Sequence, residues 1–241
     1  MKRLIWLLLL ACGALHAAET ASAPSRSPDN PDLPASIVEL IPAGYEELDH
    51  LSGHLSGTNR LDYLVVIHRA VDTMEQPSPR PLLIFTQEPA GTFRLAARND
   101  AVILRANDGG QCDPFTDSAD DGLAIKGRYF TVQHGVACGL LQHWTDYVTF
   151  RYDQDRRGWL FHSQIAQNWR QNDGPTGGIF KPDPARITKA NKDRPVSFEA
   201  WRPNGWCIHP WREDHENDSA CSAVQSQVGA NTRKLQPGKT P

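Results

Sequence analysis

"HWTDYVTFRYDQDRRGWLFHSQ" (residues 143–164) contains the clearest hairpin pattern in this chain. Over residues 143–153 two sets of side chains alternate, with Trp144, Asp146, Val148 and Phe150 in one set, which is the period of a half-buried β-strand. The turn "QDRRG" (154–158) leads directly into a second apolar run, "WLFHSQ" (159–164). Strands joined by so short a connection pair antiparallel, because a parallel pair needs a long crossover.

Short apolar runs separated by turn residues occur on both sides of this hairpin. Further strands are predicted over residues 61–70, 82–88, 92–99, 101–107, 123–127 and 129–135. "PAG" (89–91) is the predicted turn of a hairpin over 82–98, and residues 36–53 fit either one helical turn or an extended segment. We therefore predict a mainly β fold over residues 37–165, an antiparallel meander or small sandwich-like sheet and not a full propeller.

The N-terminus has the pattern of an export signal. Lys2 and Arg3 precede the apolar run 4–11, and small residues follow as far as Ala17. We predict a signal peptide over residues 1–17 and a periplasmic or secreted protein. "LLAC" (9–12) leaves lipidation of Cys12, and an anchor in the envelope, as the alternative. No other run is long and apolar enough to predict a transmembrane helix.

Composition divides the rest of the chain. Residues 18–36 are rich in Pro, Ser and Asp and predict a disordered linker. Residues 166–223 predict an irregular, Trp-rich extension that is clipped by a disulfide, and residues 224–241 predict a disordered tail. Trp201, Trp206 and Trp211 either cover the sheet or form a binding surface, since aromatic side chains are favoured at interfaces.

Four of the five cysteines follow the leader: Cys112, Cys138, Cys207 and Cys221. In an exported chain an even number predicts disulfides, although four cysteines allow three pairings. Loop closure favours the near pairs Cys112–Cys138 and Cys207–Cys221. A zinc site is the alternative, without any CxxC spacing to support it.

The charge and motifs restrict the classes of function. The formal charge is −3 and becomes −5 without Lys2 and Arg3, which gives no attraction to nucleic acid. No P-loop, G-x-G-x-x-G, H-E-x-x-H or G-x-S-x-G motif is present, so we predict no cofactor and no catalytic residues.

"GHLSGTNRLD" (53–62) precedes a predicted strand. Like a calcium-binding loop, it has polar side chains at alternate positions, glycines and an acidic residue at its end. It resembles the loop of FG-GAP/VCBS (integrin α-like) repeats, G-D-L-N-G-D-G-x-x-D. That family's ligand positions carry His54, Ser56 and Thr58 here, and Asp62 is the one carboxylate. Calcium prefers several carboxylates, so we predict no metal at this degenerate loop, which instead caps a strand through its polar side chains.

The resemblance extends over residues 37–164, to uncharacterised exported bacterial proteins with one such repeat. It includes "RPLL…RLAARND", "DPF" and "FRYD". The group's "CGG…GDPF" region reads "GGQCDPF" here, and its Gly/Ser/Trp-rich region reads "HGVACGLLQHW". These two departures together fit a Cys112–Cys138 bridge.

Three hypotheses for function follow from the sequence. The first is a non-enzymatic exported β protein that binds a protein or an envelope component. The second is an envelope hydrolase with His134, His143 and Asp146 at its site. The third is calcium-dependent adhesion through residues 53–62.

Overall fold

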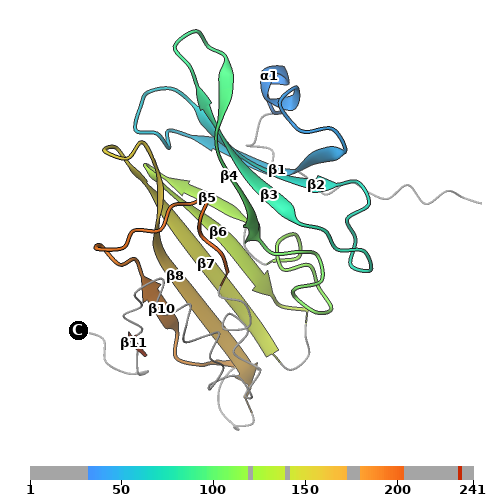
Figure 1. Ribbon diagram of the computed structural model, residues 1–241. Coiled ribbons are helices and arrows are strands. Elements are labelled where there is room, and N and C mark those ends of the chain that lie inside the picture. Colours follow the sequence, from blue (N-terminus) through green and yellow to red (C-terminus); the bar gives the residue numbers. More distant parts are fainter. Residues whose placement is uncertain (1–31, 119–121, 139–141, 173–179, 204–232, 235–241) are drawn as a thin grey trace, which may run out of the picture.

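The computed structural model describes residues 32–118, 122–138, 142–172, 180–203 and 233–234. Two antiparallel sheets pack against each other, and neither is closed into a barrel, so the predicted mainly β, sandwich-like fold is confirmed (Figure 1). Within these ranges, no helix has the length and apolar character needed to cross a membrane.

The small sheet has four strands in sequence order, β1-β2-β3-β4. Their bounds are β1 Tyr45–Gly53, β2 Asp62–Arg69, β3 Arg80–Gln87 and β4 Phe93–Ile103. The short helix α1 (Ala35–Val38) and the residues around it cover one face of this sheet, where Ile37 packs in a cluster with Val65 and Phe85. Because the second sheet covers the other face, the apolar residues 63–67 are all buried, which explains the continuous apolar run of β2.

The hairpin predicted over 82–98 is confirmed as β3 and β4, and Gly91 in its turn has a φ of 87°. The separate strand predicted over 101–107 is wrong, because β4 continues to Ile103 without a break. The side-chain oxygen of Asn99 accepts hydrogen bonds from the amides of Ala101 and Val102, which stabilise the irregular part of β4.

The large sheet has the order β11-β10-β8-β7-β6-β5, with β9 paired to the end of β8. The bounds are β5 Leu123–Lys126, β6 Tyr129–Val136, β7 Gln142–Asp153, β8 Gly158–Gln171, β9 Phe180–Pro182, β10 Arg186–Lys189 and β11 Arg233–Lys234. The hairpin expected over 143–164 is β7 and β8, in the register Val148–Gln164.

The irregular extension predicted from residue 166 is wrong in its first part, and the tail predicted over 224–241 contains β11. Strand β8 runs to Gln171 and β10 continues the sheet. The sequence did not predict these strands for two reasons. The segment is rich in Pro and Gly between the strands, and short strands with polar outer faces have little apolar pattern of their own.

The main core lies between the two sheets. Leu64 and Ile84 of the small sheet share one apolar cluster with Phe130, Val148 and Phe150 of the large sheet. The segment 190–203 passes over the inner face of the large sheet (Figure 1) and adds Phe198 and Trp201, which are 0% and 2% exposed. The ring of Phe150 makes edge-to-face contacts with the rings of both.

A disulfide and a buried ion pair hold the loop of residues 108–118 in place. The predicted disulfide Cys112–Cys138 is present, with the two Cα atoms 6.4 Å apart. Arg80 is buried and binds Asp72 and Asp113 through its guanidinium, each at 2.6 Å. Burial alone would raise the pKa of Asp113, but hydrogen bonds from Arg80 and from the amide of Phe115 lower it below its ordinary value.

Candidate binding site

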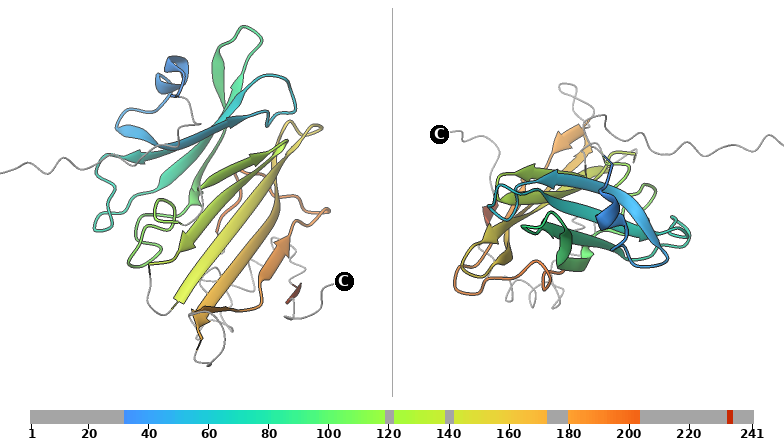
Figure 2. Two further views of the ribbon diagram at one scale, coloured as in Figure 1. Left: turned by 180° about the vertical axis from the view of Figure 1, so that it is seen from behind. Right: turned by 90° about the horizontal axis from the view of Figure 1, so that it is seen from above.

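The candidate site lies on the outer face of the large sheet, the face turned away from the small sheet. Successive side chains of a strand point to opposite faces, so β7 buries Val148 and Phe150 in the core and turns Thr145 and Tyr147 outward. In the view from behind, no described element passes in front of β6, β7 and β8 (Figure 2). Among the described residues, nothing therefore covers this face along most of its length.

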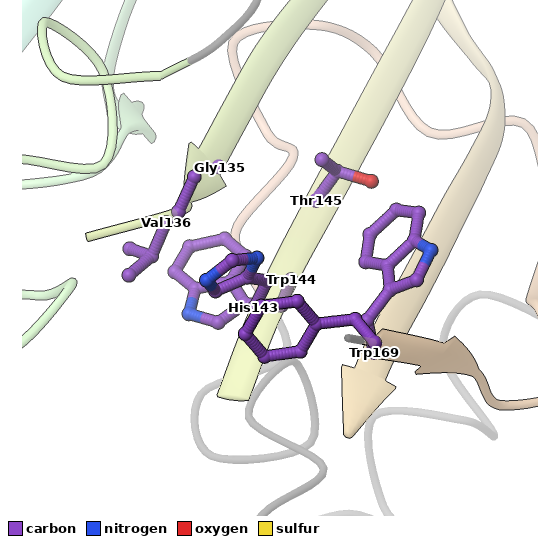
Figure 3. A pocket seen from close by; sticks show the side chains of 8 residues that line it. Gly135, Val136, His143, Trp144, Thr145 and Trp169 are labelled. Carbon is purple, nitrogen blue, oxygen red and sulfur yellow. The ribbon is translucent and has the colours of Figure 1, made fainter. Parts of the chain in front are cut away.

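A pocket of about 210 Å³ lies at one end of this outer face. Strand register explains its position: His143 is opposite Trp169, and Gln171 is opposite Phe180, which brings three rings from β7, β8 and β9 to one place. The side chains around it are shown in Figure 3. The lining residues are Gly135, Val136, Ala137, His143, Trp144, Thr145, Trp169 and Phe180.

The pocket combines stacked rings with one buried hydroxyl group. The rings of His143 and Phe180 lie 3.8 Å apart between centroids, at an angle of 31°. The hydroxyl of Thr145 is buried and has no hydrogen-bond partner among the residues the structure describes. At this volume, below the roughly 300–1,000 Å³ of drug-sized sites, the pocket has room for a single ring or one large side chain.

Trp169 and Phe180 were not predicted as site residues from the sequence. Trp169 lies in the segment that was predicted to be irregular. A bulge near residue 162 reverses the faces of β8, so Ile165, Gln167 and Trp169 lie on the outer face although Trp159 and Phe161 are buried on the inner one, and the alternation that starts at residue 159 does not continue in phase.

The opposite, inner face of the same strands carries two buried titratable residues. His134 accepts a hydrogen bond from the amide of Leu104 at Nε2 (3.2 Å), and burial lowers its pKa to about 3, so the ring is neutral. Burial raises the pKa of Asp146 to about 7, against the opposing effect of the Gln164 amide, which donates to both carboxylate oxygens at 2.9 and 3.0 Å. Both side chains are almost fully buried.

The hydrolase hypothesis required His134, His143 and Asp146 to meet. His134 and Asp146 are cross-strand partners on the inner face, whereas His143 is an odd number of positions from Asp146 and faces outward into the pocket. The three residues therefore do not form one site.

The loop of residues 53–62 is closed by its own carboxylate. Asp62 is fully buried and accepts a hydrogen bond from the amide of Ser56 at 2.6 Å. The hydroxyls of Ser56 and Thr58 are 3.2 Å apart, and His54 Nδ1 lies 3.0 Å from the carbonyl oxygen of Arg60. These contacts match the strand-capping role that the sequence predicted for the polar side chains of the loop.

The remaining predicted site residues fall in two groups. Trp201 is buried beneath Phe150 and Phe161, so the prediction of a binding surface is wrong at this position, and its alternative role as cover for the sheet holds. Trp206, Trp211, Cys207, Cys221 and Cys12 lie outside the described residues.

In the part of the chain that the structure describes, no group of three or more His, Cys, Asp or Glu side chains is arranged to hold a metal ion. Comparison with known proteins found no matching family model, no similar curated protein and no similar solved structure.

Proposed function

We propose that this chain is an exported bacterial protein without enzymatic activity, which binds a protein or another envelope component through the pocket of His143, Trp169 and Phe180. The observation that carries the proposal is this ring-lined pocket on an open sheet face. Aromatic side chains bury a large area at low entropic cost, and small pockets of this kind commonly receive an anchoring group of a partner. Among the described lining residues His143 alone is titratable, and its ring is stacked on Phe180.

Export is the finer part of this proposal. It is supported by the leader pattern of residues 1–17 and by the Cys112–Cys138 disulfide, since disulfides persist mainly in oxidising compartments. The proposed relationship to single-repeat FG-GAP-like proteins agrees with export, but it assigns no activity.

The intact mass of the protein from the envelope fraction tests export. A mature chain that starts at Ala18 is the expected result, whereas a lipid-modified chain that starts at Cys12 supports the anchored alternative. A chain that retains Met1 and reduced cysteines contradicts export.

Site-specific photo-crosslinking in the native cell tests binding. A benzoylphenylalanine at Tyr147, which lies beside the pocket on the same face, is expected to give one discrete adduct. The same group at Leu95, which is 47% exposed on β4 of the other sheet, is the control and is expected to give none. Substitution Trp169→Ala in the Tyr147 derivative is expected to abolish the adduct.

Absence of an adduct at Tyr147 in folded protein contradicts the proposal, as do equal adducts at both positions. Thermal denaturation establishes that each variant is folded. If Trp169→Ala fails to fold, Phe180→Ala provides the second test, because Phe180 belongs to the short strand β9 and is not part of a buried cluster.

A further inference from the structure

The end of the outer face opposite the pocket carries a row of cations and rings across the large sheet. Lys126 on β5, Arg151 on β7 and Lys189 on β10 are all exposed. Tyr129 on β6 and His162 on β8 contribute rings, which meet edge-to-face with centroids 5.1 Å apart. We call Lys126, Arg151 and Lys189 the cation row.

Strand register places Lys126, Tyr129 and Arg151 on one line across the sheet and Lys189 on the next line, that of Thr149 and Ser163. Lys126 is opposite Tyr129, and Tyr129 is opposite Arg151. Lys189 is opposite Ser163, the neighbour of His162 in a bulge of β8. Neighbouring strands are about 4.8 Å apart, so successive members of the cation row, two strands from each other, are separated by roughly 10 Å along the sheet.

The two rings lie between the cations and meet edge-to-face, with an angle of 74° between their planes. Since β7 separates β6 from β8, rings in contact at 5.1 Å must lean toward each other over β7. Burial lowers the pKa of His162, and the charges of Arg151 and Lys189 lower it further. His162 is therefore a neutral ring near neutral pH, with both cations close to it.

Among the described residues, the cations of the row have no carboxylate partner, and Asp153, two positions from Arg151 on β7, pairs with Arg156 instead. Between this row and the pocket, the outward side chains of β6, β7 and β8 are neutral. They are mainly hydroxyl and amide groups, those of Thr131, Gln133, Thr145, Thr149, Ser163 and Gln167. A positive, hydroxyl-rich face on a chain of net charge −3 indicates an anionic ligand.

We propose that the cation row and the Tyr129–His162 ring pair bind an acidic polysaccharide, a chain of sugar rings that carry carboxylates. The apolar face of a sugar ring packs on the exposed ring of His162, carboxylates on alternate sugars pair with cations two strands apart, and sugar hydroxyls bond to the Thr, Ser and Gln side chains. The inference rests on the proposed function in using the same outer face, but it uses none of the pocket's aromatic residues.

Calorimetric titration of the purified mature protein with a defined oligogalacturonate tests this proposal, with a neutral oligosaccharide of equal length as the ligand control. Binding of the acidic oligosaccharide alone is expected, and it should weaken as salt is added. Arg151→Gln and Lys189→Gln are each expected to lower the affinity roughly tenfold, as for loss of a charge-assisted hydrogen bond. Arg94→Gln removes an exposed charge from the small sheet and is expected to leave the affinity unchanged.

Equal affinity for the neutral oligosaccharide overturns the proposal, as does an equal loss of affinity in Arg94→Gln. Equal affinity for single-stranded DNA also overturns it, because the face would then be a general polyanion surface. Failure to bind oligogalacturonate, together with a specific crosslink at Tyr147, rejects this inference and leaves the proposed function standing. Oligogalacturonate binding without that crosslink rejects the pocket and retains the cation row.

Discussion

At the scale of single residues, the strongest physical signals are polar groups buried in the large sheet. The sequence predicted that Asp146 shares a face with Val148 and Phe150, and the structure confirms it. It did not predict that this carboxylate is almost fully buried, because burial depends on what packs against the face. Its hydrogen-bond partner Gln164 lies on the next strand, and that pairing depends on the register.

Substitution Asp146→Asn should change how stability depends on pH. With a pKa of about 7 when folded and 3.8 ordinarily, Asp146 keeps a proton that the unfolded chain releases between about pH 4 and pH 7. Its contribution to the free energy of unfolding therefore falls as pH rises through that range. Between about pH 5 and pH 8, we expect the free energy of unfolding of the variant, measured by urea denaturation, to exceed that of wild type by a few kcal/mol.

His134 has the opposite effect on stability. The unfolded chain protonates this residue near pH 6.5, whereas the folded chain protonates it near pH 3, so its contribution rises with pH between these values. The effects of Asp146 and His134 on how stability depends on pH have opposite signs and offset each other in wild type. Comparison of wild type with Asp146→Asn isolates the effect of Asp146. Asp155→Asn, in the exposed turn after β7, is the control, and a pH-independent gain in Asp146→Asn would contradict the prediction.

At the scale of elements, strands with strong alternation could be predicted and short polar strands could not. β2, β3, β6 and β7 were predicted close to their observed bounds. β10 was missed because Ile187 is the one apolar residue among its four, and the last part of β8 was missed because a bulge near residue 162 shifts its alternation. The pocket was missed for the same reason, since two of its rings lie on segments that were not predicted as strands.

The β3–β4 turn allows a direct test of element formation. Gly91 has a φ of 87°, and no atom lies within 4 Å of the position that a Cβ would occupy, so Gly91→Ala introduces backbone strain without a clash. We expect the free energy of unfolding to fall by about 1 kcal/mol or more. Gly158→Ala is the matched control, because Gly158 has no positive φ and the nearest atom to its Cβ position, the carbonyl oxygen of Arg156, lies at an ordinary contact distance of 3.9 Å. An equal effect of both substitutions would contradict this explanation.

At the scale of the whole molecule, the sheets are joined by side chains far apart in sequence. The Cys112–Cys138 disulfide could be predicted because loop closure favours near pairs, whereas the buried Arg80–Asp113 pair connects a strand to a loop that no local pattern relates to it. The short connections between strands predicted the antiparallel pairing, but they held no information about how the two sheets meet.

Removal of the disulfide should lower the stability of the whole molecule. The bridge closes a loop over a sequence separation of 26, and the double substitution Cys112→Ala, Cys138→Ala is expected to cost about 3 kcal/mol. Urea denaturation with and without reductant measures it. Any further loss on reduction of the double variant reports a second bridge, between Cys207 and Cys221, and no difference between wild type and variant would contradict the prediction.

The contact between Asn99 and the segment of Phe198 and Trp201 also determines when the molecule can fold. The Asn99 side-chain amide donates to the carbonyl oxygens of both residues, at sequence separations of 99 and 102. During synthesis, and during passage through a membrane if the chain is exported, the early strands emerge long before the residues that cover their shared core. The chain must therefore stay unfolded or be held by a chaperone until its last third has emerged, because partly built sheets with exposed edges tend to aggregate.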